Sequence, residues 1–327
     1  MGEIRGKKIL VIGGAGFIGS TIVDQLTQQD VAEVIVYDNF CRGTHKNLES
    51  ALRDPRVRIF DIGGDILQAD VLATAMKESD MVVHLAALWL LQCHDYPRAA
   101  FDVNVRGTFN VLEACRDAQI ERLVYSSSAS VYGNALETPM TEDHPFNNRN
   151  FYGATKIAGE AMCRAFNDRY GLDYVGLRYM NVYGPRQDYK GAYIAVIMKM
   201  LDRIDQGLAP MIYGDGSQSY DFVYVGDVAR ANLCALQSSA TDRFYNVGTG
   251  IGTSIRQLTD LILDVTECGL DAEYVPQGQS FVTERLGSIE AAREDLGFLA
   301  NTPLREGIAR LIDWRLQDKA RHLAQDR

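Results

Sequence analysis

Short apolar runs alternate with amphipathic segments along the first half of the chain. Most of the runs are continuously apolar, which is typical of strands buried on both faces of a parallel sheet. Strands that alternate with helices predict an α/β fold with a doubly wound parallel sheet of the Rossmann type, because right-handed crossovers place helices on both faces. The expected strands lie at 8–12, 33–37, 57–60, 81–85, 123–126 and 174–177, and the expected helices at 17–29, 69–77, 101–117 and 152–170.

The rhythm changes after about residue 181, where glycines and prolines divide the chain into shorter elements. These shorter elements predict a smaller C-terminal α/β lobe that binds the substrate. Its expected strands lie at 222–225 and 244–247, and its expected helices at 255–266 and 304–317. We expect a cofactor-binding domain over 1–184, to which the chain returns around 221–247, and a substrate-binding lobe over 185–220 and 248–327.

Charge and composition exclude several classes of function. The chain of 327 residues has 33 Lys and Arg against 43 Asp and Glu, a net charge of -10, which argues against nucleic acid or an anionic membrane as a partner. No apolar run is long enough to span a bilayer. The six cysteines form no CxxC pair, and the sequence has no HxH, HExxH or Cys/His cluster. We therefore expect a cytoplasmic protein with reduced thiols and no bound metal.

A glycine-rich turn follows the first expected strand and leads into the first helix. Gly13, Gly16 and Gly19 have the spacing with which a tight turn brings the backbone and a helix N-terminus close to a pyrophosphate. Asp38 ends the second expected strand, 19 residues after Gly19. A carboxylate at this position holds the ribose hydroxyls of a dinucleotide and repels a 2′-phosphate, so the pattern predicts NAD as the cofactor.

Three polar residues have a spacing suited to the oxidation of an alcohol. Tyr152 and Lys156 lie one helical turn apart, and Ser128 follows the strand expected at 123–126, at the carboxyl end of the sheet where ligands bind. A tyrosinate removes the hydroxyl proton as the hydride leaves carbon, and a serine donates a hydrogen bond to the reacting oxygen. A neighbouring ammonium and a positive nicotinamide both favour the tyrosinate. The sequence therefore predicts Ser128, Tyr152 and Lys156 as catalytic residues.

These motifs, with others along nearly the whole chain, resemble the extended short-chain dehydrogenases/reductases of the nucleotide-sugar epimerase/dehydratase family, including its UDP-glucose 4-epimerase-like members. The resemblance implies an NAD-dependent enzyme whose small-molecule substrate is a nucleotide sugar. It also implies a homodimer in which the helices at 101–117 and 152–170 of two subunits form a four-helix bundle. The stretches that carry the resemblance are GGAGFIGS (13–20), YDNFCRG (37–43), GDI (64–66), HLAA (84–87), VNVRGTFNVLEA (103–114), SSSASVYG (126–133), YGATK (152–156), LRYMNVYGP (177–185), GDGSQSYDFVYVGDV (214–228) and NVGTG (246–250).

The resemblance assigns further roles to single residues. It places Asp65 and Ile66 beside the adenine and Tyr179 near the nicotinamide, and it implies that Asn104 steadies the backbone of the site. The substrate would contact Ser128, Tyr152, Asn181 and Tyr220, with Asn181 near its diphosphate. The implied cofactor-binding residues are Gly13, Gly16, Phe17, Ile18, Gly19, Asp38, Asn39, Arg42, Gly43, Asp65, Ile66, Leu85, Ala86, Ala87, Asn104, Ser126, Tyr152, Lys156 and Tyr179.

Two departures from the family pattern narrow the chemistry. Relatives that dehydrate the sugar carry Asp-Glu directly after the catalytic hydroxyl residue, where this chain has Ala129 and Ser130. A 4-epimerase, which oxidises C4 and reduces it again on the opposite face, needs no such carboxyl pair and is favoured. The second departure is a missing arginine, because Tyr220 stands where the family has the arginine that binds the diphosphate. A second basic residue of the family pattern is absent from 278–281. Arg186, Lys190 and Arg285 are the candidates to replace these two missing positive charges.

Other functions stay open at this point. The missing arginines also fit a net NAD-dependent dehydrogenase or reductase that acts on a sugar, a sugar acid or another small alcohol. A dehydratase or decarboxylase fits less well, because the carboxylates that assist those reactions are absent. A non-catalytic protein that only senses NAD is disfavoured, because such family members usually lose the tyrosine or the lysine.

Overall fold

The computed structural model describes residues 3–189, 195–276 and 284–325 and is built around one parallel sheet of seven strands. All neighbouring strands run parallel, in the order β11-β6-β5-β4-β1-β2-β3. The order reverses between β1 and β4, and the carboxyl ends at such a switch point are where ligands bind in doubly wound sheets. The strands are β1 (Lys8–Ile12), β2 (Glu33–Tyr37), β3 (Val57–Ile59), β4 (Met81–His84), β5 (Arg122–Ser128), β6 (Tyr174–Tyr179) and β11 (Arg243–Val247).

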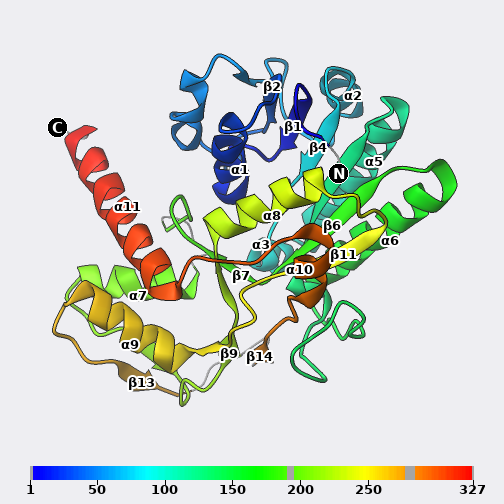
Figure 1. Ribbon diagram of the computed structural model, residues 1–327. Helices are drawn as coiled ribbons and strands as arrows, with labels where there is room; N and C mark the ends of the chain where they lie inside the picture. Colours follow the sequence, from blue (N-terminus) through cyan, green and yellow to red (C-terminus); the bar gives the residue numbers. More distant parts are fainter. Residues whose placement is uncertain (1–2, 190–194, 277–283, 326–327) are drawn as a thin grey trace.

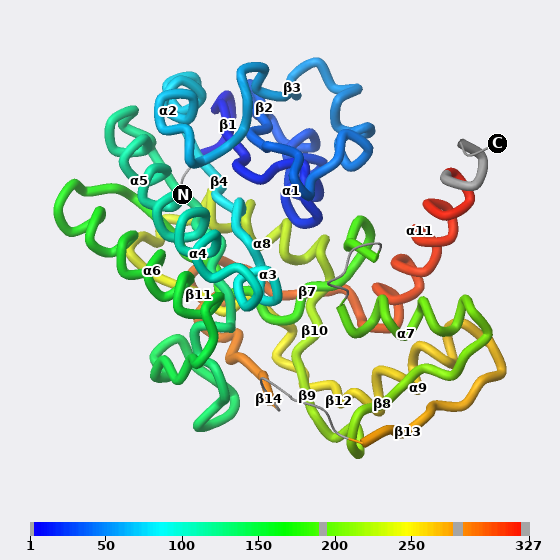
Figure 2. Tube along the Cα trace, turned by 180° about the vertical axis from the view of Figure 1, so that it is seen from behind, coloured from blue at the N-terminus to red at the C-terminus, as the bar shows by residue number. Residues whose placement is uncertain are grey.

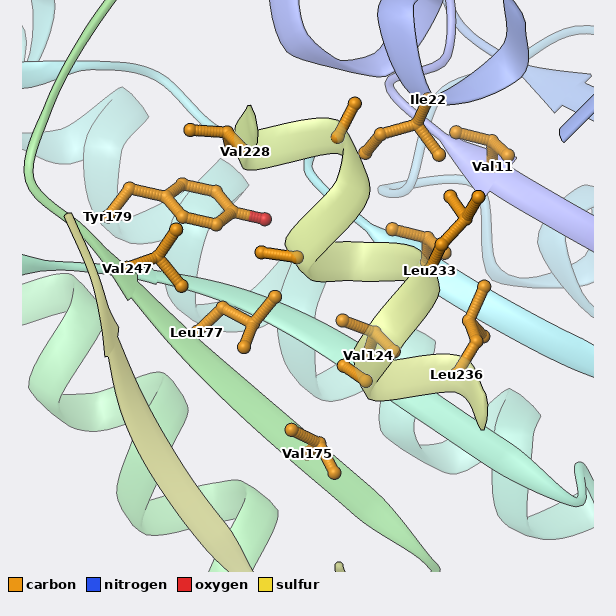
Figure 3. Close-up of a cluster of buried hydrophobic side chains, with 14 of the residues drawn as sticks. Val11, Ile22, Val124, Val175, Leu177, Tyr179, Val228, Leu233, Leu236 and Val247 are labelled. Atoms are coloured by element: carbon orange, nitrogen blue, oxygen red, sulfur yellow. The ribbon is translucent and has the colours of Figure 1, made fainter. Parts of the chain in front are cut away.

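Helices α1 (Phe17–Thr27) and α8 (Val225–Gln237) cover one face of this sheet and pack against each other (Figure 1). Small and branched side chains of α8 meet the apolar residues of β5, β6 and β11, and Figure 3 shows this layer. Val124, Val175 and Val247 are fully buried in it. The continuous apolar character of the strands is thus explained, because the opposite face of the sheet is covered as well.

The opposite face is covered by three helices, α2 (Ala69–Lys77), α5 (Thr108–Asp117) and α6 (Phe151–Tyr170), of which α5 packs against both α2 and α6. Between β4 and α5 the chain forms the short helices α3 (Leu90–Asp95) and α4 (Pro97–Ala100), followed by the π-helical turn η3 (Phe101–Gly107). The expected helix at 101–117 therefore begins as a π-helix and becomes an α-helix only at Thr108. Three short 3-10 helices complete this part: η1 (His45–Leu48), η2 (Ala51–Arg53) and η4 (Ala129–Val131).

A smaller group of short strands and helices lies beyond the carboxyl ends of the main sheet (Figures 1 and 2). Its strands pair as β10-β7, β12-β9-β14 and β13-β8, and helices α7, α9 and α11 enclose a separate apolar cluster. The elements are β7 (Asn181–Tyr183), α7 (Val196–Asp205), β8 (Met211–Tyr213), β9 (Ser219–Tyr220), β10 (Phe222–Tyr224), β12 (Thr253–Ser254), α9 (Ile255–Thr266), β13 (Glu273–Val275), β14 (Glu284–Arg285) and α11 (Leu304–Gln325). Helix α10 (Glu290–Leu296) packs instead against β11 and α8 of the main sheet.

The predicted fold class is confirmed, and three details differ from the expected elements. β5 extends to Ser128, two residues beyond its expected end at Ser126, so Ser128 is the last residue of the strand. β10 pairs with β7 in a separate two-stranded sheet, so β11, and not β10, returns to the main sheet. α11 continues to Gln325, eight residues beyond its expected end. None of the helices in the described ranges combines the length and the apolar character needed to cross a bilayer.

Candidate active site

A cavity of about 970 Å³ opens at the carboxyl ends of β1, β4, β5 and β6 and continues between the sheet and the smaller group of strands. The structure brings together in its lining every residue that the sequence predicts for the site except Asn104. One end is formed by the glycine-rich turn and the other by segments from β7, α7, β8, β9 and β14.

The glycine-rich turn has the geometry of a pyrophosphate cradle. Gly13 has a φ of +82°, and a Cβ added to Gly19 would lie 2.1 Å from the Gly13 carbonyl oxygen, so the turn requires glycine at both positions. Helix α1 begins directly after it with no side-chain cap at Gly16, which leaves the first N–H groups of the helix for an anion. This turn therefore fits the diphosphate of a dinucleotide.

Asp38 lies beside the turn, at the end of β2, and is held there by two backbone groups. Its Oδ2 accepts a hydrogen bond from the Ala15 N–H at 2.9 Å, and its Oδ1 accepts one from the Phe40 N–H at 2.8 Å. Burial raises the pKa of this carboxyl, while the two N–H donors lower it. The remaining lone pairs fit ribose hydroxyls, and a 2′-phosphate would meet the negative charge of the carboxylate.

The next part of the cavity is shaped by Asp65 and Ile66, which the resemblance places at the adenine. The Tyr37 hydroxyl donates to the Asp65 carbonyl oxygen at 3.0 Å, and the amide of Asn110 donates to the Ile66 carbonyl oxygen at 2.9 Å. These bonds hold the 65–66 backbone against the sheet. Arg42, which also lines the cavity, forms an ion pair with Asp188 at 3.2 Å.

Ser128, Tyr152 and Lys156 meet at the bottom of the cavity. Lys156 is buried on α6, and its Nζ donates to the Ser126 carbonyl oxygen at 2.7 Å and lies 5.8 Å from the centre of the Tyr152 ring. Ser128, at the end of β5, accepts a hydrogen bond from the Ser130 N–H at 3.1 Å. A serine, a tyrosine and a lysine from two separate elements are thus assembled around one space that an alcohol can enter.

The surroundings of these residues shift their proton affinities. Burial raises the pKa of Tyr152 to about 12, while a hydrogen bond with Ser128 and the positive charge of Arg285 lower it. Burial lowers the pKa of Lys156 to about 8. The cationic ring of an oxidised nicotinamide beside Tyr152 would favour the tyrosinate further. A cation bound next to Tyr152 therefore increases the fraction of this side chain that is present as the phenolate, the form that can accept a proton.

Asn104 lies behind the cavity and not in its lining. Its Oδ1 accepts a hydrogen bond from the Leu88 N–H at 2.7 Å, and its Nδ2 donates to the Leu88 carbonyl oxygen at 2.9 Å and to the Thr155 hydroxyl at 3.0 Å. Asn104 thus links Leu88 to the helix that carries Tyr152. Because Asn104 is absent from the described lining, the structure offers no cavity-facing surface for its predicted contact with the cofactor, and that contact stays a prediction.

Tyr179 lines the cavity, but its hydroxyl is engaged within the protein. It hydrogen bonds with the Ser126 hydroxyl at 2.9 Å and donates to Asn232 Oδ1 at 3.0 Å. Figure 3 shows the Tyr179 ring between Val247 and α8. The side of this ring that faces the cavity is the part left to contact a ligand.

The substrate end is held together by Asp221, which follows Tyr220. The fully buried Asp221 carboxylate accepts hydrogen bonds from the N–H groups of Thr249 and Gly250 at 2.9 Å each, and from the Thr249 hydroxyl at 2.7 Å. Its backbone links neighbouring strands, because the Asp221 N–H donates to the Arg285 carbonyl oxygen and the Asn181 N–H donates to the Asp221 carbonyl oxygen, both at 2.9 Å. Asp221 thus holds Asn181 and Tyr220 in place.

The three candidates for the missing basic residues differ in their surroundings. Arg186 forms an ion pair with Asp24 of α1 at 2.6 Å, so its charge is compensated within the protein. Arg285 lines the cavity next to Tyr220. Lys190, and the segment 278–281 where a second basic residue is absent, lie outside the described residues.

Carboxylates are confined to the other parts of the cavity. In the described lining they belong to Asp38, Asp65 and Asp188, of which Asp188 pairs with Arg42. Ser130 lines the cavity at the position where the family resemblance implies a carboxylate for a dehydratase. The internal segments 190–194 and 277–283, which the structure does not describe, contain no Asp or Glu. Within the described ranges no group of three or more His, Cys, Asp and Glu side chains is arranged to hold a metal ion.

The sequence missed part of the substrate end. Residues of α7 and β8, among them Lys199, Arg203 and Tyr213, line the cavity although no motif marked them. The spacing of Lys199 and Arg203, four apart on a strongly amphipathic helix, places them on one face and was the available signal. The helical spacing does not show, however, that this face of α7 points into the cavity.

Comparisons with known proteins agree with this geometry. The model of the NAD-dependent epimerase/dehydratase family matches residues 9–248, and the chain belongs to this family. It is 38% identical over 309 residues to a protein of Methanocaldococcus jannaschii with the provisional name UDP-glucose 4-epimerase, covering 94% of this chain and 97% of the relative. It is 31% identical over 322 residues to a dTDP-glucose 4,6-dehydratase of Actinoplanes sp., covering 94% of this chain and 97% of that one.

A solved structure is similar over nearly the whole chain. It is the UDP-N-acetylglucosamine 4-epimerase of Methanobrevibacter ruminantium M1 in complex with UDP-N-acetylmuramic acid, with a TM-score of 0.90 and 34% identity, covering 96% of this chain and 99% of that one. The matches include both epimerases and a dehydratase. Family membership therefore establishes an NAD-dependent enzyme class that acts on nucleotide sugars, and the reaction within that class depends on the chemistry of the site.

Proposed function

We propose that the protein is a nucleotide-sugar 4-epimerase that oxidises the sugar at C4 to a ketone and reduces it again on the opposite face. The observation that carries the proposal is the environment of Ser128, Tyr152 and Lys156. They share a cavity with a dinucleotide cradle, and the described lining of that cavity has no carboxylate next to them. Elimination of water from the sugar needs a further acid and base to remove the C5 proton and expel the C6 hydroxyl. Epimerisation needs only one group that takes a proton from the C4 oxygen and returns it.

The chain's own residues divide the work in this proposal. Tyr152, as its phenolate, accepts the proton of the C4 hydroxyl and later returns it to the same oxygen. Ser128 donates a hydrogen bond to that oxygen and so stabilises the charge that develops on it. Lys156 places a positive charge one helical turn from Tyr152, held in position by the Ser126 carbonyl oxygen. The ketone presents its other face before the proton returns, and no net oxidation results.

We infer that the cofactor is NAD, bound by the turn at Gly13–Gly19 and by Asp38. When bound, NAD supplies the hydride acceptor and donor for C4. The relatives' names support a uridine or thymidine diphosphate sugar as substrate. We also propose the division of labour expected from the sequence, in which 1–184 bind the cofactor and 185–220 with 248–327 bind the substrate.

The experiment that tests the reaction follows cofactor and sugar separately. Purified protein is analysed for bound nucleotide and then incubated with UDP-glucose, UDP-N-acetylglucosamine, UDP-glucuronate and dTDP-glucose without added NAD. We expect about one NAD per chain and a mixture of C4 epimers, detected by NMR, with no accumulation of NADH. Stoichiometric NADH with a sugar acid or ketone product would indicate a dehydrogenase instead. A 4-keto-6-deoxy product would indicate a dehydratase.

We further propose that the protein forms a homodimer through α5 and α6. Aromatic side chains are exposed on η3, α5 and α6, including Phe101 (58%), Phe109 (41%) and Phe151 (54%). Exposed aromatic side chains on two helices that pack against each other fit a contact with a second copy of the same face. In sedimentation velocity we expect a dimer for the wild type and a monomer for Phe101→Glu. Leu208→Glu, at a comparably exposed apolar residue outside this face, serves as the control and should stay dimeric.

A further inference from the structure

One arginine in the described lining of the cavity has no carboxylate partner among the residues that the structure describes. Four arginines line its described part, and three of them have a carboxylate partner: Arg42 pairs with Asp188 at 3.2 Å, Arg186 with Asp24 at 2.6 Å and Arg203 with Glu273 at 3.1 Å. Arg285 has no ion pair and donates no side-chain hydrogen bond to any described residue. It is therefore the arginine whose charge is available to a ligand.

Arg285 is also enclosed, which makes the absence of a partner energetically significant. Its Nε is fully buried and has no hydrogen-bond partner, and burial lowers the pKa of the guanidinium. A buried donor without an acceptor loses its hydration without compensation. Because Arg285 lines the cavity, a ligand there can bring an acceptor to the rest of the guanidinium and compensate its charge.

The position of Arg285 places that acceptor at the reacting end of the cavity. β14 runs parallel to β9, with Arg285 in register with Tyr220, and the Asp221 N–H donates to the Arg285 carbonyl oxygen at 2.9 Å. The guanidinium is close enough to Tyr152 for its charge to lower the pKa of that phenol. The groups that act electrostatically on Arg285 are the phenols of Tyr220 and Tyr152, and no carboxylate among the described residues does so.

Neighbouring strands lie about 4.8 Å apart, a distance that a long arginine side chain spans with ease. An arginine on β14 can therefore reach the same region of the cavity that an arginine at position 220 of β9 would reach. The tyrosine at 220 and the arginine at 285 fill adjacent positions of one small sheet, so the positive charge missing from β9 is present on the next strand.

We propose that Arg285 binds an anionic oxygen group of the substrate in the space between Tyr220 and Tyr152. The planar guanidinium suits a phosphate or a carboxylate, to which it donates two parallel hydrogen bonds. Two parts of a nucleotide sugar carry such a group: the diphosphate, and a carboxylate on the sugar itself. This inference rests on the proposed function, because it assumes a nucleotide-sugar substrate.

The test compares ligands that differ in one anionic group at a time. Wild type, Arg285→Gln and Arg285→Lys are titrated by calorimetry with UDP, UDP-glucose and UDP-glucuronate, and with dTDP analogues if the wild type prefers thymidine. We expect Arg285→Gln to weaken binding about ten- to hundred-fold, the range for a lost hydrogen bond between charged groups. Arg285→Lys, which keeps the charge and loses the planar fork, should bind with intermediate affinity.

The pattern of losses identifies the anion. An equal loss for all three ligands indicates the diphosphate, and a loss confined to UDP-glucuronate indicates a carboxylate on the sugar. Arg293→Gln, an exposed arginine on α10 that pairs with Glu290, is the control and should bind all ligands as the wild type does. Melting curves and NAD content verify that each variant is folded.

Two outcomes separate this inference from the proposed function. If the wild type binds the nucleotides and Arg285→Gln binds them equally well, Arg285 has no such role and the epimerase proposal is unaffected. If the wild type binds none of the nucleotides or nucleotide sugars, the substrate class itself is wrong and both proposals fail.

Discussion

The two ends of the cavity are built in different ways. The cofactor end consists of one glycine-rich turn and the ends of long, paired strands, and its main ligand groups are backbone N–H groups fixed by the fold. The substrate end is assembled from strands of two or three residues that come from distant parts of the chain, such as β7, β9 and β14. The cofactor end therefore depends on local backbone geometry, whereas the substrate end depends on which short segments the tertiary structure places next to one another.

This difference has a consequence for how each end tolerates change. At the cofactor end the ligand groups belong to the backbone, so a substitution that alters the backbone path displaces them, and no other residue can supply them. At the substrate end a charge is supplied by a side chain, and an adjacent strand supplies it equally well. Arg285 beside Tyr220 illustrates this freedom.

The largest expected effect lies where the two ends meet. Tyr152→Phe removes the hydroxyl that exchanges a proton with the sugar, and we expect kcat to fall by about 10²- to 10⁴-fold. Bound NAD, measured after denaturation of the purified protein, should stay within twofold of the wild-type amount. Retention of wild-type kcat would show that another group exchanges the proton.

A break at the cofactor end should be nearly as severe. In Gly19→Ala the new Cβ would lie 2.1 Å from the Gly13 carbonyl oxygen, so the turn must shift. We expect loss of bound NAD and destabilisation by about 1–3 kcal/mol, as for other overpacked sites. Gly252→Ala is the matched control, because its nearest neighbour is the hydroxyl of the Ser219 side chain. If Gly19→Ala retained its NAD, the turn would not be the cradle.

A break at the substrate end should instead change affinity. In Asp221→Asn the negative charge is lost, and the NH2 group cannot accept a hydrogen bond as the oxygen it replaces does. The hydrogen bonds from Thr249 and Gly250 are therefore weakened, which loosens the strands that carry Tyr220 and Asn181. We expect KM for the nucleotide sugar to rise about tenfold, the lower range for such bonds, with kcat nearly unchanged. Asp215→Asn, at an exposed turn of the same region, is the control. A fall in kcat with constant KM would contradict a positioning role at this end.

The smallest effect on catalysis is expected for a substitution of His84, at the end of β4. There we expect a change in how stability depends on pH. Its Nε2 pairs with the Thr108 hydroxyl at 3.1 Å, and burial lowers its pKa from 6.5 to about 3. The unfolded chain therefore binds a proton between pH 6.5 and 3 that the folded chain does not, so stability falls as the pH drops through this range. The wild type should lose about 2 kcal/mol more than His84→Asn between pH 7 and 5, measured by urea unfolding. Parallel losses in both proteins would assign the acid sensitivity to other groups.

Much of the cofactor end was predictable from the sequence. Gly13, Gly16 and Gly19 between a strand and a helix, and Asp38 at the end of the next strand, lie within 26 residues of one another, and their geometry follows from local rules for turns and strand ends. Tyr152 and Lys156 share a helix face for a similar reason. The seven-stranded parallel sheet was predicted in outline, because apolar runs of strand length alternate with helical patterns.

The tertiary structure decided what depends on contacts between distant segments. The sequence placed Asn104 among the cofactor contacts, whereas its amide group lies behind the cavity and joins Leu88 to Thr155. Arg186 was a candidate to bind the substrate, and only the packing of its loop against α1 shows that Asp24 already neutralises it. Arg285 could not be distinguished from it in the sequence, because the charge on a side chain is available to a ligand only if no neighbour in the folded chain compensates it.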